Sequence, residues 1–327
     1  MAKNIEHEYA IGVDIGGTNT KYGIVNRRGD ILYRGVISTS AYETAETFLD
    51  ALHTALLPAI QESGGMAAIK GIGVGAPNAN YYTGNVEYAP NLRWKGIVPL
   101  AKMLNEKFGF PAAITNDANA AAVGEMNYGA ARGMKDFIMI TLGTGVGSGI
   151  VANGQLILGH DGFAGELGHV IVIPNGRLHP STGFHGSLES YASANGMCTT
   201  AKELLKESEE PSMLRDEKEL DAKTIFDCAV KGDAIAKKVF EFTGNILGQA
   251  LANFVMFSSP QAIILFGGVT KAGDILMKPV SDSMEKNLLP IFRNKVKLIF
   301  SELKESDAAI LGASALVWEI TDKDKKG

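Results

Sequence analysis

Two glycine-rich turns in the sequence carry residue types suited to binding phosphate. The first runs from Asp14 to Lys21 (DIGGTNTK) and the second from Thr141 to Gly149 (TLGTGVGSG). Each lies between apolar runs typical of β-strands, so each is predicted to be a tight hairpin. Glycine permits positive φ and lets the backbone aim successive N–H groups at an anion. The pair predicts that a nucleotide's phosphates are bound from two sides, by Gly16, Gly17, Thr18, Asn19 and Lys21 and by Gly143, Thr144 and Gly145.

The carboxylate of Asp14 stands at the start of the first turn. It would repel a phosphate unless a divalent cation lay between them, which predicts Mg²⁺ carried with a nucleotide. The alternative is that Asp14 only forms the turn. Neither turn has the Gly-Lys-Ser/Thr ending of a Walker A loop, and the HRD and DFG strings of protein kinases are absent from the sequence.

A third glycine signal, Gly267-Gly268, follows the buried-strand run Ile263–Phe266. Paired glycines at the end of such a strand would let a flat ring lie against the backbone, which predicts a contact with adenosine. A plain strand-to-helix turn is the alternative, because glycine pairs mark turns of every kind.

The composition is that of a globular enzyme and excludes several classes of protein. The 327 residues are 46% hydrophobic, enough for two domains with cores of their own. A formal net charge of −5 argues against a nucleic-acid partner. Cys198 and Cys228 lie in no metal or redox spacing and are expected to be buried thiols. We expect no membrane association and a cytoplasmic location, because the sequence has no apolar leader and no transmembrane-length run.

The order of predicted elements indicates a duplicated fold. Strands alternate with a helix over residues 45–64, and a strand over 112–115 leads into a helix that begins at Asn116-Asp117. From Phe137 the strand-hairpin pattern restarts. We therefore expect a smaller domain of residues 1–115, joined by a C-terminal helix over 307–327, and a larger domain of residues 116–306. The small apolar residues of 308–320 predict that this helix packs tightly.

In series, the motifs resemble the ROK family, which comprises bacterial sugar kinases and related repressors. The resemblance runs from about residue 11 to residue 316. It rests on Asp14 to Thr18, Asn91-Leu92-x-Trp94, Asn116-Asp117-x-Asn119, the turn at 143–149, Glu166-Leu167-Gly168-His169, Glu189 and Asp307 to Ala313. It implies an α/β protein with the actin-like ATPase (ribonuclease H-like) fold, in two lobes with a duplicated βββαβα core and an active site in the cleft between them.

The resemblance also implies an activity and a set of site residues. It implies an ATP-dependent hexose kinase of glucokinase type, with Asp117 as the general base that takes a proton from a sugar hydroxyl. From the residues alone, Asp117 could instead be no more than a helix N-cap. As the cap-proximal carboxylate at a helix start, it is expected to stay ionised. The family's hexose contacts correspond to Asn91, Asn116, Asp117, Glu166, His169 and Glu189. A homodimer is what the family suggests.

The sequence departs from the family where typical members have a zinc site. There a Cys-x-Cys-x4-Cys segment joins the histidine that corresponds to His169, whereas this chain has Pro180, Thr182 and Ser187. Proline and neutral hydroxyls are poor zinc ligands, so we expect no structural zinc and a loop held by hydrogen bonds. The alternative is a nitrogen site in which His179 and His185 join His169.

A second departure is Pro77-Asn78, where the family usually has Pro-Gly. Asparagine tolerates the left-handed backbone region, so we expect the turn to survive.

Several alternatives stay open at the level of sequence. Kinases of N-acetylmannosamine, N-acetylglucosamine or fructose belong to the same class, and the donor could be polyphosphate rather than ATP. A sugar-sensing repressor would carry a helix-turn-helix ahead of the Asp14 motif, and only thirteen residues precede Asp14 here. A non-catalytic sugar-binding module would not need Asp14 and Asp117.

Overall fold

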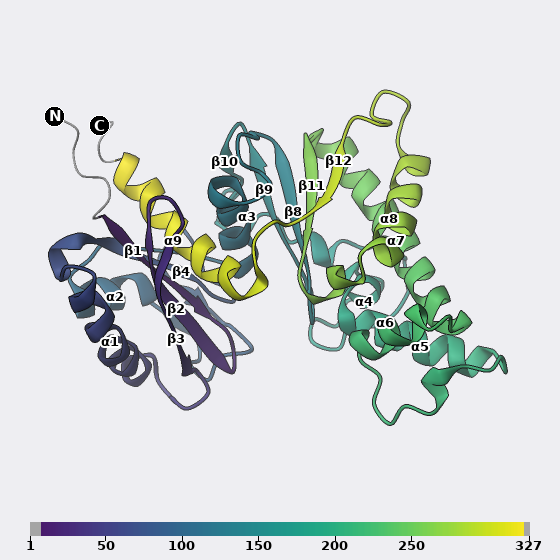
Figure 1. Ribbon diagram of the computed structural model, residues 1–327, viewed down its shortest axis with the longest axis horizontal. Coiled ribbons are helices and arrows are strands. Elements are labelled where there is room, and N and C mark those ends of the chain that lie inside the picture. The colour runs from purple at the N-terminus through teal and green to yellow at the C-terminus, as the bar shows by residue number, and fades with distance from the viewer. Residues whose placement is uncertain (1–7, 324–327) are drawn as a thin grey trace. The chain divides into compact units, whose positions relative to one another are not determined.

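The first glycine-rich turn connects β1 (Tyr9–Ile15) and β2 (Asn19–Asn26), which pair antiparallel as predicted. The computed structural model describes residues 8–323 and divides into two compact units, each an α/β assembly (Figure 1). Of the described residues, unit 1 comprises those up to 134, 155–164 and those from 302 onward, and unit 2 comprises residues 135–154 and 165–301.

The sheet of unit 1 has the strand order β3-β2-β1-β4-β7. The two pairs among β1, β2 and β3 (Ile31–Ser38) are antiparallel, whereas β4 (Ile69–Gly75) and β7 (Ala112–Thr115) extend the sheet in parallel. Around it are the other elements of the unit: α1 (Ala45–Glu62), η2 (Met66–Ala68), β5 (Val86–Glu87), β6 (Ile97–Val98), α2 (Leu100–Phe108), α3 (Asp117–Tyr128), β10 (Gln155–Leu156) and α9 (Glu305–Lys323).

The strands that lie within unit 2 repeat the β2-β1-β4-β7 part of this arrangement in the order β9-β8-β11-β12. The hairpin of β8 (Phe137–Leu142) and β9 (Val146–Ala152) is antiparallel, and β11 (Ala262–Phe266) and β12 (Lys297–Phe300) join in parallel. The helices are η3 (Leu167–His169), α4 (Glu189–Ala192), α5 (Ala194–Glu207), η4 (Met213–Arg215), α6 (Ala222–Val230), α7 (Ala234–Ser258), η5 (Gly268–Ala272) and α8 (Asp274–Asn287). The predicted duplication and the actin-like ATPase fold are thereby confirmed.

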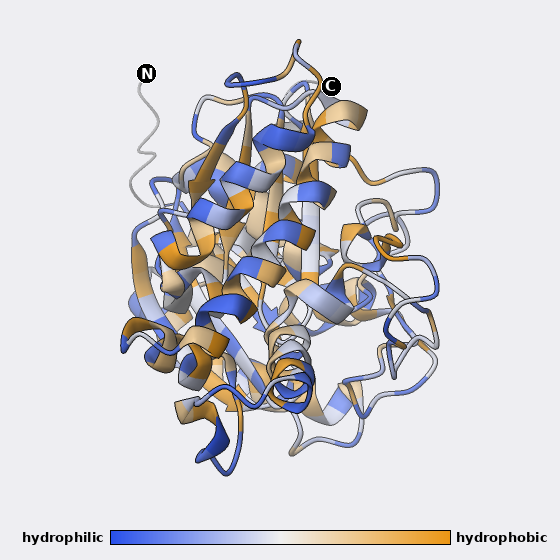
Figure 2. Ribbon diagram, turned by 90° about the vertical axis from the view of Figure 1, so that its right-hand side faces the viewer, coloured by the Kyte–Doolittle hydropathy of each residue, from blue (hydrophilic) through white to orange (hydrophobic). Residues whose placement is uncertain are grey.

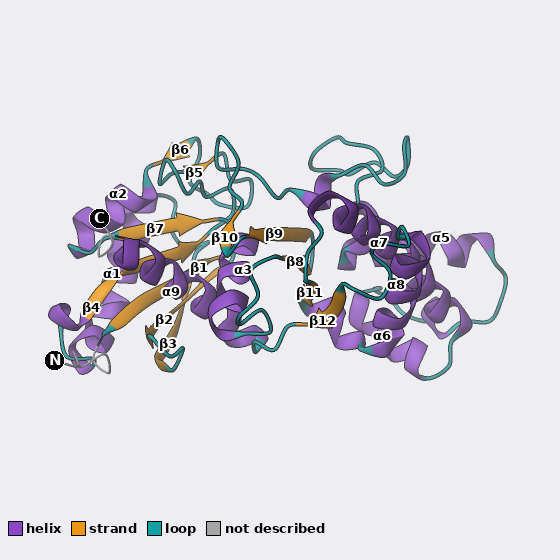
Figure 3. Ribbon diagram, turned by 90° about the horizontal axis from the view of Figure 1, so that it is seen from above, coloured by secondary structure: helices purple, strands orange, loops and turns teal. Residues whose placement is uncertain are grey.

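Each sheet is buried by amphipathic helices. In unit 1, Phe48, Leu52 and Leu56 of α1 are fully buried against apolar strand residues such as Ile11 and Ile72. In unit 2, α7 and α8 pack on the sheet, and the helices that face the viewer in Figure 2 carry hydrophobic and hydrophilic residues along their length. Figure 3 shows the helices of unit 2, among them α6, α7 and α8, on one side of its strands. No helix in residues 8–323 has the length and apolarity that crossing a bilayer requires.

The C-terminal helix α9 lies unusually close to the sheet of unit 1. A Cβ on Gly12 of β1 would overlap the carbonyl oxygen of Ile310, and one on Gly73 of β4 would overlap that of Ala313. Ala313 and Ala315 are fully buried. Glycines on the strands and alanines on the helix therefore let the two backbones approach closely, as the sequence of 308–320 predicts.

Helix α3 is grouped with unit 1, whereas the sequence pattern places residues 116–306 in the larger domain. Its backbone lies against α9, because a Cβ on Gly124 would lie 2.9 Å from the Cα of Gly312. Where the two lobes divide stays a prediction.

Candidate active site

The first hairpin presents its turn beside the segment that contains Asn91. The turn is closed by a 3.0 Å hydrogen bond from the N–H of Gly16 to the carbonyl oxygen of Asn19. A Cβ on Gly17 would lie only 2.7 Å from the carbonyl oxygen of Asn91. Thr18 and Asn19 are exposed. A predicted phosphate-binding turn and a predicted sugar contact are thus neighbours within unit 1.

The glycines of the two hairpins do not serve to provide positive φ. Gly16, Gly17, Gly143 and Gly145 are all outside the positive-φ region, so that part of the sequence prediction is wrong. Two of these positions require glycine because there is no room for a side chain. A Cβ on Gly17 would crowd Asn91, and a Cβ on Gly145 would overlap the carboxylate of Glu189. Gly143 has no neighbouring atom within 4 Å of its Cβ position, so a side chain there would project into open space in front of the hairpin.

Asp14 and Asp117 influence one another electrostatically. Asp14 is the sixth residue of β1 and pairs in register with Lys21 of β2. The pKa of Asp14 is raised from 3.8 to about 6, first by burial and then by the negative charge of Asp117, while Lys21 lowers it. An ionised Asp14 therefore lacks sufficient compensating charge in the protein alone, which fits a residue that faces a cation.

Asp117 occupies the first turn of α3 and is not its cap. The cap is Asn116, whose Oδ1 accepts a 2.7 Å hydrogen bond from the N–H of Asn119. Asp117 Oδ1 accepts a 2.8 Å hydrogen bond from the N–H of Ala118. The interpretation of Asp117 as only a cap is therefore wrong, because its neighbour performs that function.

The environment of Asp117 raises its pKa. The Asp117 side chain is exposed to solvent, yet the surrounding protein makes desolvation the largest cause of the rise in its pKa. The hydrogen bond from the N–H of Ala118 lowers the pKa but only partly offsets this rise. Desolvation thus acts against the helix start and the Ala118 hydrogen bond, and the expected ionised state of Asp117 stays a prediction. A carboxylate whose pKa moves toward neutrality is a better proton acceptor than an ordinary aspartate.

The second hairpin lies beside the third glycine signal. The N–H of Gly143 donates a 3.0 Å hydrogen bond to the carbonyl oxygen of Gly145. Gly267 has a φ of 106°, and a Cβ on it would lie 2.5 Å from the carbonyl oxygen of Leu142 at the end of β8. Gly268, the first residue of η5, has open space at its Cβ position. The structure thus brings Gly143, Gly267 and Gly268 together in unit 2, and leaves Thr144 exposed.

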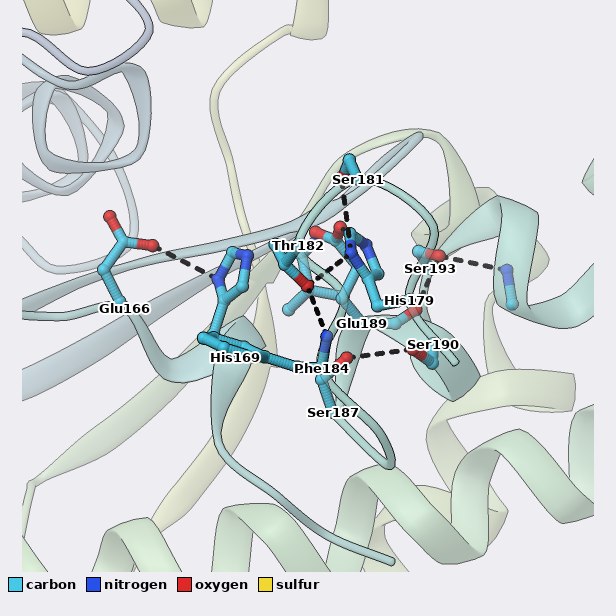
Figure 4. Close-up of polar contacts among 12 residues, drawn as sticks. Glu166, His169, His179, Ser181, Thr182, Phe184, Ser187, Glu189, Ser190 and Ser193 are labelled. Atoms are coloured by element: carbon cyan, nitrogen blue, oxygen red, sulfur yellow. Dashed lines mark hydrogen bonds and ion pairs between the residues drawn. The ribbon is translucent and has the colours of Figure 1, made fainter. Parts of the chain in front are cut away.

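Glu166 directly precedes the short helix η3, and His169 is the last residue of that helix. Glu166 Oε2 is 3.4 Å from His169 Nδ1, within ion-pair distance but outside hydrogen-bond geometry (Figure 4). Among residues 8–323, this Nδ1 is one of five buried side-chain polar atoms without a hydrogen-bond partner. A polar ligand could satisfy it, because buried polar groups in proteins are nearly always paired.

Glu189, at the start of α4, has both carboxylate oxygens engaged. Oε2 accepts a 2.6 Å hydrogen bond from the N–H of Val146, the first residue of β9. Oε1 lies 2.6 Å from Nε2 of His179. Figure 4 shows Glu189 and His179 together with Thr182 and Ser181. The sequence suggests His179 only as a metal ligand, and no signal in it points to the pairing with Glu189.

Two of the three zinc-site positions, Thr182 and Ser187, carry hydroxyl groups that form hydrogen bonds. Thr182 Oγ1 is 2.9 Å from His179 Nδ1, and Ser187 Oγ is 2.9 Å from Ser190 Oγ. His185 Nδ1 donates a 2.9 Å hydrogen bond to the carbonyl oxygen of Gly176. Within the described part of the chain no three His, Cys, Asp or Glu residues are grouped to hold a metal. The zinc content of the purified protein stays a prediction.

The turn at Pro77-Asn78 survives the family departure as expected. Asn78 has a φ of 51°, in the left-handed region, and its Nδ2 donates a 3.0 Å hydrogen bond to the carbonyl oxygen of Glu87.

The order of these groups along the chain matches that of a known family. The sequence pattern of the ROK family matches residues 10–320. The chain belongs to the ROK family.

This ROK protein is similar to curated and solved relatives over nearly its whole length. It is 36% identical to a glucokinase of Halalkalibacterium halodurans, covering 97% of each chain. It is 33% identical to a ROK family glucokinase of Streptomyces griseus, solved with glucose and AMPPNP, covering 95% of this chain and 99% of that one with a TM-score of 0.78. It is 30% identical to a xylose repressor of Bacillus spizizenii, covering 95% of this chain and 77% of the repressor.

Proposed function

We propose that this ROK protein transfers the γ-phosphoryl group of ATP to the 6-hydroxyl of glucose, with Asp117 as the general base. One observation carries the proposal: a solvent-accessible carboxylate with a raised pKa, Asp117, lies near enough to Asp14 of the first glycine hairpin for their charges to interact. The similarity to glucokinases, one of them solved with glucose and a nucleotide analogue, supports the choice of substrates.

Asp117 accepts the proton of the sugar hydroxyl while the oxygen of that hydroxyl attacks the γ-phosphorus of ATP. The O–H bond breaks, the oxygen forms the new bond to phosphorus, and ADP leaves. The hydrogen bond from Ala118 holds Oδ1, which leaves Oδ2 to face the sugar. Base catalysis of this kind contributes about 10²- to 10⁴-fold in rate.

Asp14 is the residue proposed to face Mg²⁺ carried by the nucleotide. A bound divalent cation supplies positive charge that neutralises the phosphates. The fit is supported by the raised pKa of Asp14, because a carboxylate that is costly to ionise in the protein alone is stabilised when it faces a cation. The phosphates are proposed to lie against Gly16, Gly17, Thr18, Asn19 and Lys21 and against Gly143, Thr144 and Gly145, and the adenosine against Gly267 and Gly268.

The sugar is proposed to be held by Asn91, Asn116, Glu166, His169 and Glu189, together with Asp117. The Nδ1 of His169, which has no hydrogen-bond partner, supports this assignment, because a sugar hydroxyl is a partner of the required kind. A wrong sugar would leave such groups unpaired, at a cost of about 1 to 3 kcal/mol each.

A panel of sugars and donors tests the proposal. ADP release is measured with ATP and glucose, mannose, fructose, N-acetylglucosamine or N-acetylmannosamine, and glucose phosphorylation is repeated with polyphosphate as donor. The expected result is the highest kcat/KM with glucose and ATP. A preference for N-acetylmannosamine would overturn the substrate. Sugar binding by calorimetry without any turnover would favour a sugar-sensing protein instead, the activity class of the repressor relative.

A further inference from the structure

We propose that His179 is a positioning residue that fixes the Glu189 carboxylate between the sugar and the second glycine hairpin. This role rests on the proposed function of Glu189 as a sugar contact and gives His179 a part of its own. Four sets of contacts in unit 2 support it.

The first set holds the carboxylate from two directions. Glu189 Oε1 lies 2.6 Å from Nε2 of His179, and Glu189 Oε2 accepts a 2.6 Å hydrogen bond from the N–H of Val146. A carboxylate with one partner can rotate about its last torsion, which is broad. Two partners on separate oxygens fix the plane of the group, so its remaining lone pairs point in one set of directions.

The second set holds His179. Its Nδ1 lies 2.9 Å from Thr182 Oγ1 and 3.2 Å from Ser181 Oγ, and the ring packs edge-on against His169 with centroids 5.9 Å apart. The side chain is only 11% exposed. A neutral ring satisfies both sides when Nε2 carries the proton for Glu189 and Nδ1 accepts from a hydroxyl.

The third set holds the loop from which the histidine projects. The N–H of His179 donates a 2.7 Å hydrogen bond to the carbonyl oxygen of Phe184. The carbonyl oxygen of His179 accepts a 2.9 Å hydrogen bond from the N–H of Gly183. Leu178 and His185 form an isolated antiparallel bridge. These bonds close residues 178–185 into a compact turn. Backbone pairing and hydroxyl groups thereby fix the loop at the positions where typical family members bind zinc.

The fourth set joins the pair to the hairpin. Val146 follows directly after the turn 143–145, and its carbonyl oxygen is so close to Gly168 that a Cβ there would overlap it. Ser148 Oγ accepts a 3.1 Å hydrogen bond from the N–H of Leu167 and donates one to the carbonyl oxygen of Gly165. The first residues of β9 thus support both Glu189 and the segment with Glu166 and His169.

A cavity of about 300 Å³ opens beside this arrangement. Thr144 of the hairpin, His179 and Glu189 are among its lining residues. The Glu189 carboxylate therefore lines a space that a ligand can enter and also accepts a hydrogen bond from the backbone of the hairpin. Removing His179 should release the carboxylate on the ligand side while Val146 still holds it on the other.

The test compares His179→Gln with His179→Asn. The glutamine amide can reach the position of Nε2 and donate to Glu189, whereas the asparagine amide reaches only the position of Nδ1. We expect His179→Asn and His179→Ala to raise the KM for glucose roughly 10- to 100-fold, as loss of a hydrogen bond to a charged group requires, with a smaller change in the KM for ATP. His179→Gln should restore most of the glucose affinity.

Two controls separate a positioning role from a general effect on the loop. His185→Ala changes the same loop without touching Glu189 and should keep the wild-type KM for glucose. Glu189→Gln should itself raise that KM, and adding His179→Asn to it should have little further effect. Thermal melting of each variant shows whether it is folded, and Thr182→Val weakens the Nδ1 side while keeping the ring, should His179→Ala fail to fold.

Distinct outcomes overturn distinct claims. Equal KM values in His179→Asn, His179→Gln and His185→Ala would reject the positioning role. An unchanged KM in Glu189→Gln would reject the sugar contact itself. If EDTA treatment of the wild-type protein, followed by Mg²⁺ alone, reproduced the His179→Asn phenotype, His179 would be a metal ligand and the positioning role would be wrong.

Discussion

The negative charge of Asp117 raises the pKa of Asp14, although Asp14 lies in the first strand of the first hairpin and Asp117 begins a helix more than a hundred residues later. Burial is the larger cause, and it brings the pKa of Asp14 to about 6. Two carboxylates in one protein environment, without a cation, oppose ionisation of one another. The first prediction follows from this pair.

Asp14→Asn should stabilise the nucleotide-free protein at neutral pH. The folded-state pKa of Asp14 is above its unfolded value of 3.8, so its contribution favours folding below pH 3.8 and is lost as pH rises through about 6. This difference corresponds to at most ~3 kcal/mol. Urea unfolding without Mg²⁺ should show the variant gaining stability over wild type between pH 4 and pH 7. A constant difference across that range would contradict the assigned pKa.

Asp117→Asn should lower kcat by at least roughly a hundredfold with little change in glucose affinity, because it keeps the shape and removes the proton acceptor. Stopped-time ADP assays and calorimetric glucose binding measure the two quantities. Asp282→Asn, in an exposed pair with Lys278, is the matched control and should behave as wild type. Near-normal turnover in Asp117→Asn would rule out the base.

The wild-type kcat should also fall as the solution becomes more acidic. A base must be ionised to accept a proton, and desolvation raises the pKa of Asp117, so protonation inactivates it at a higher pH than it would an aspartate with its ordinary pKa. A pH profile of kcat with glucose held saturating measures this. Activity that persists unchanged down to pH 4 would argue that another group accepts the proton.

Gly143→Ala and Gly145→Ala should separate phosphate binding from sugar binding. A methyl group on Gly143 meets no protein atom, so the variant should fold normally and bind ATP more weakly, because the methyl occupies the space in front of the hairpin. A methyl group on Gly145 would overlap the Glu189 carboxylate and should raise the KM for glucose as well. Melting temperatures and both KM values test the pair. Identical effects of the two substitutions would contradict the distinction.

Gly73→Ala should destabilise unit 1, because the added Cβ overlaps the carbonyl oxygen of Ala313 and pushes α9 away from β4. Overpacking of this kind costs about 1 to 3 kcal/mol. Urea unfolding measures the loss, with Gly143→Ala as the control for a glycine substitution without a steric neighbour. Equal stability of the two variants would show that α9 is free to shift.

Elemental analysis of protein purified without chelator should find less than stoichiometric zinc. The positions Pro180, Thr182 and Ser187 offer no thiolate, and the hydroxyl groups of Thr182 and Ser187 are engaged by His179 and Ser190. Activity lost to EDTA should return fully with Mg²⁺ alone. One zinc per chain would refute the metal-free loop.

Much of this protein follows from local sequence. Glycines and threonines between apolar strands predict both hairpins, Asn116 next to an alanine-rich segment predicts the start of α3, and small residues at 308–320 predict a closely packed helix. Each of these depends on backbone freedom, capping or periodicity within a few residues. The candidate base, the candidate sugar contacts and the loss of zinc ligands come instead from the resemblance to the ROK family.

What only the tertiary structure decided are the contacts between distant segments. No motif indicates that Gly145 is required by the carboxylate of Glu189, that His179 faces that carboxylate, or that Asp14 and Asp117 share an electrostatic environment. Burial, overlap and Coulomb interaction depend on distances in space, and folding sets those distances between residues that no local pattern connects.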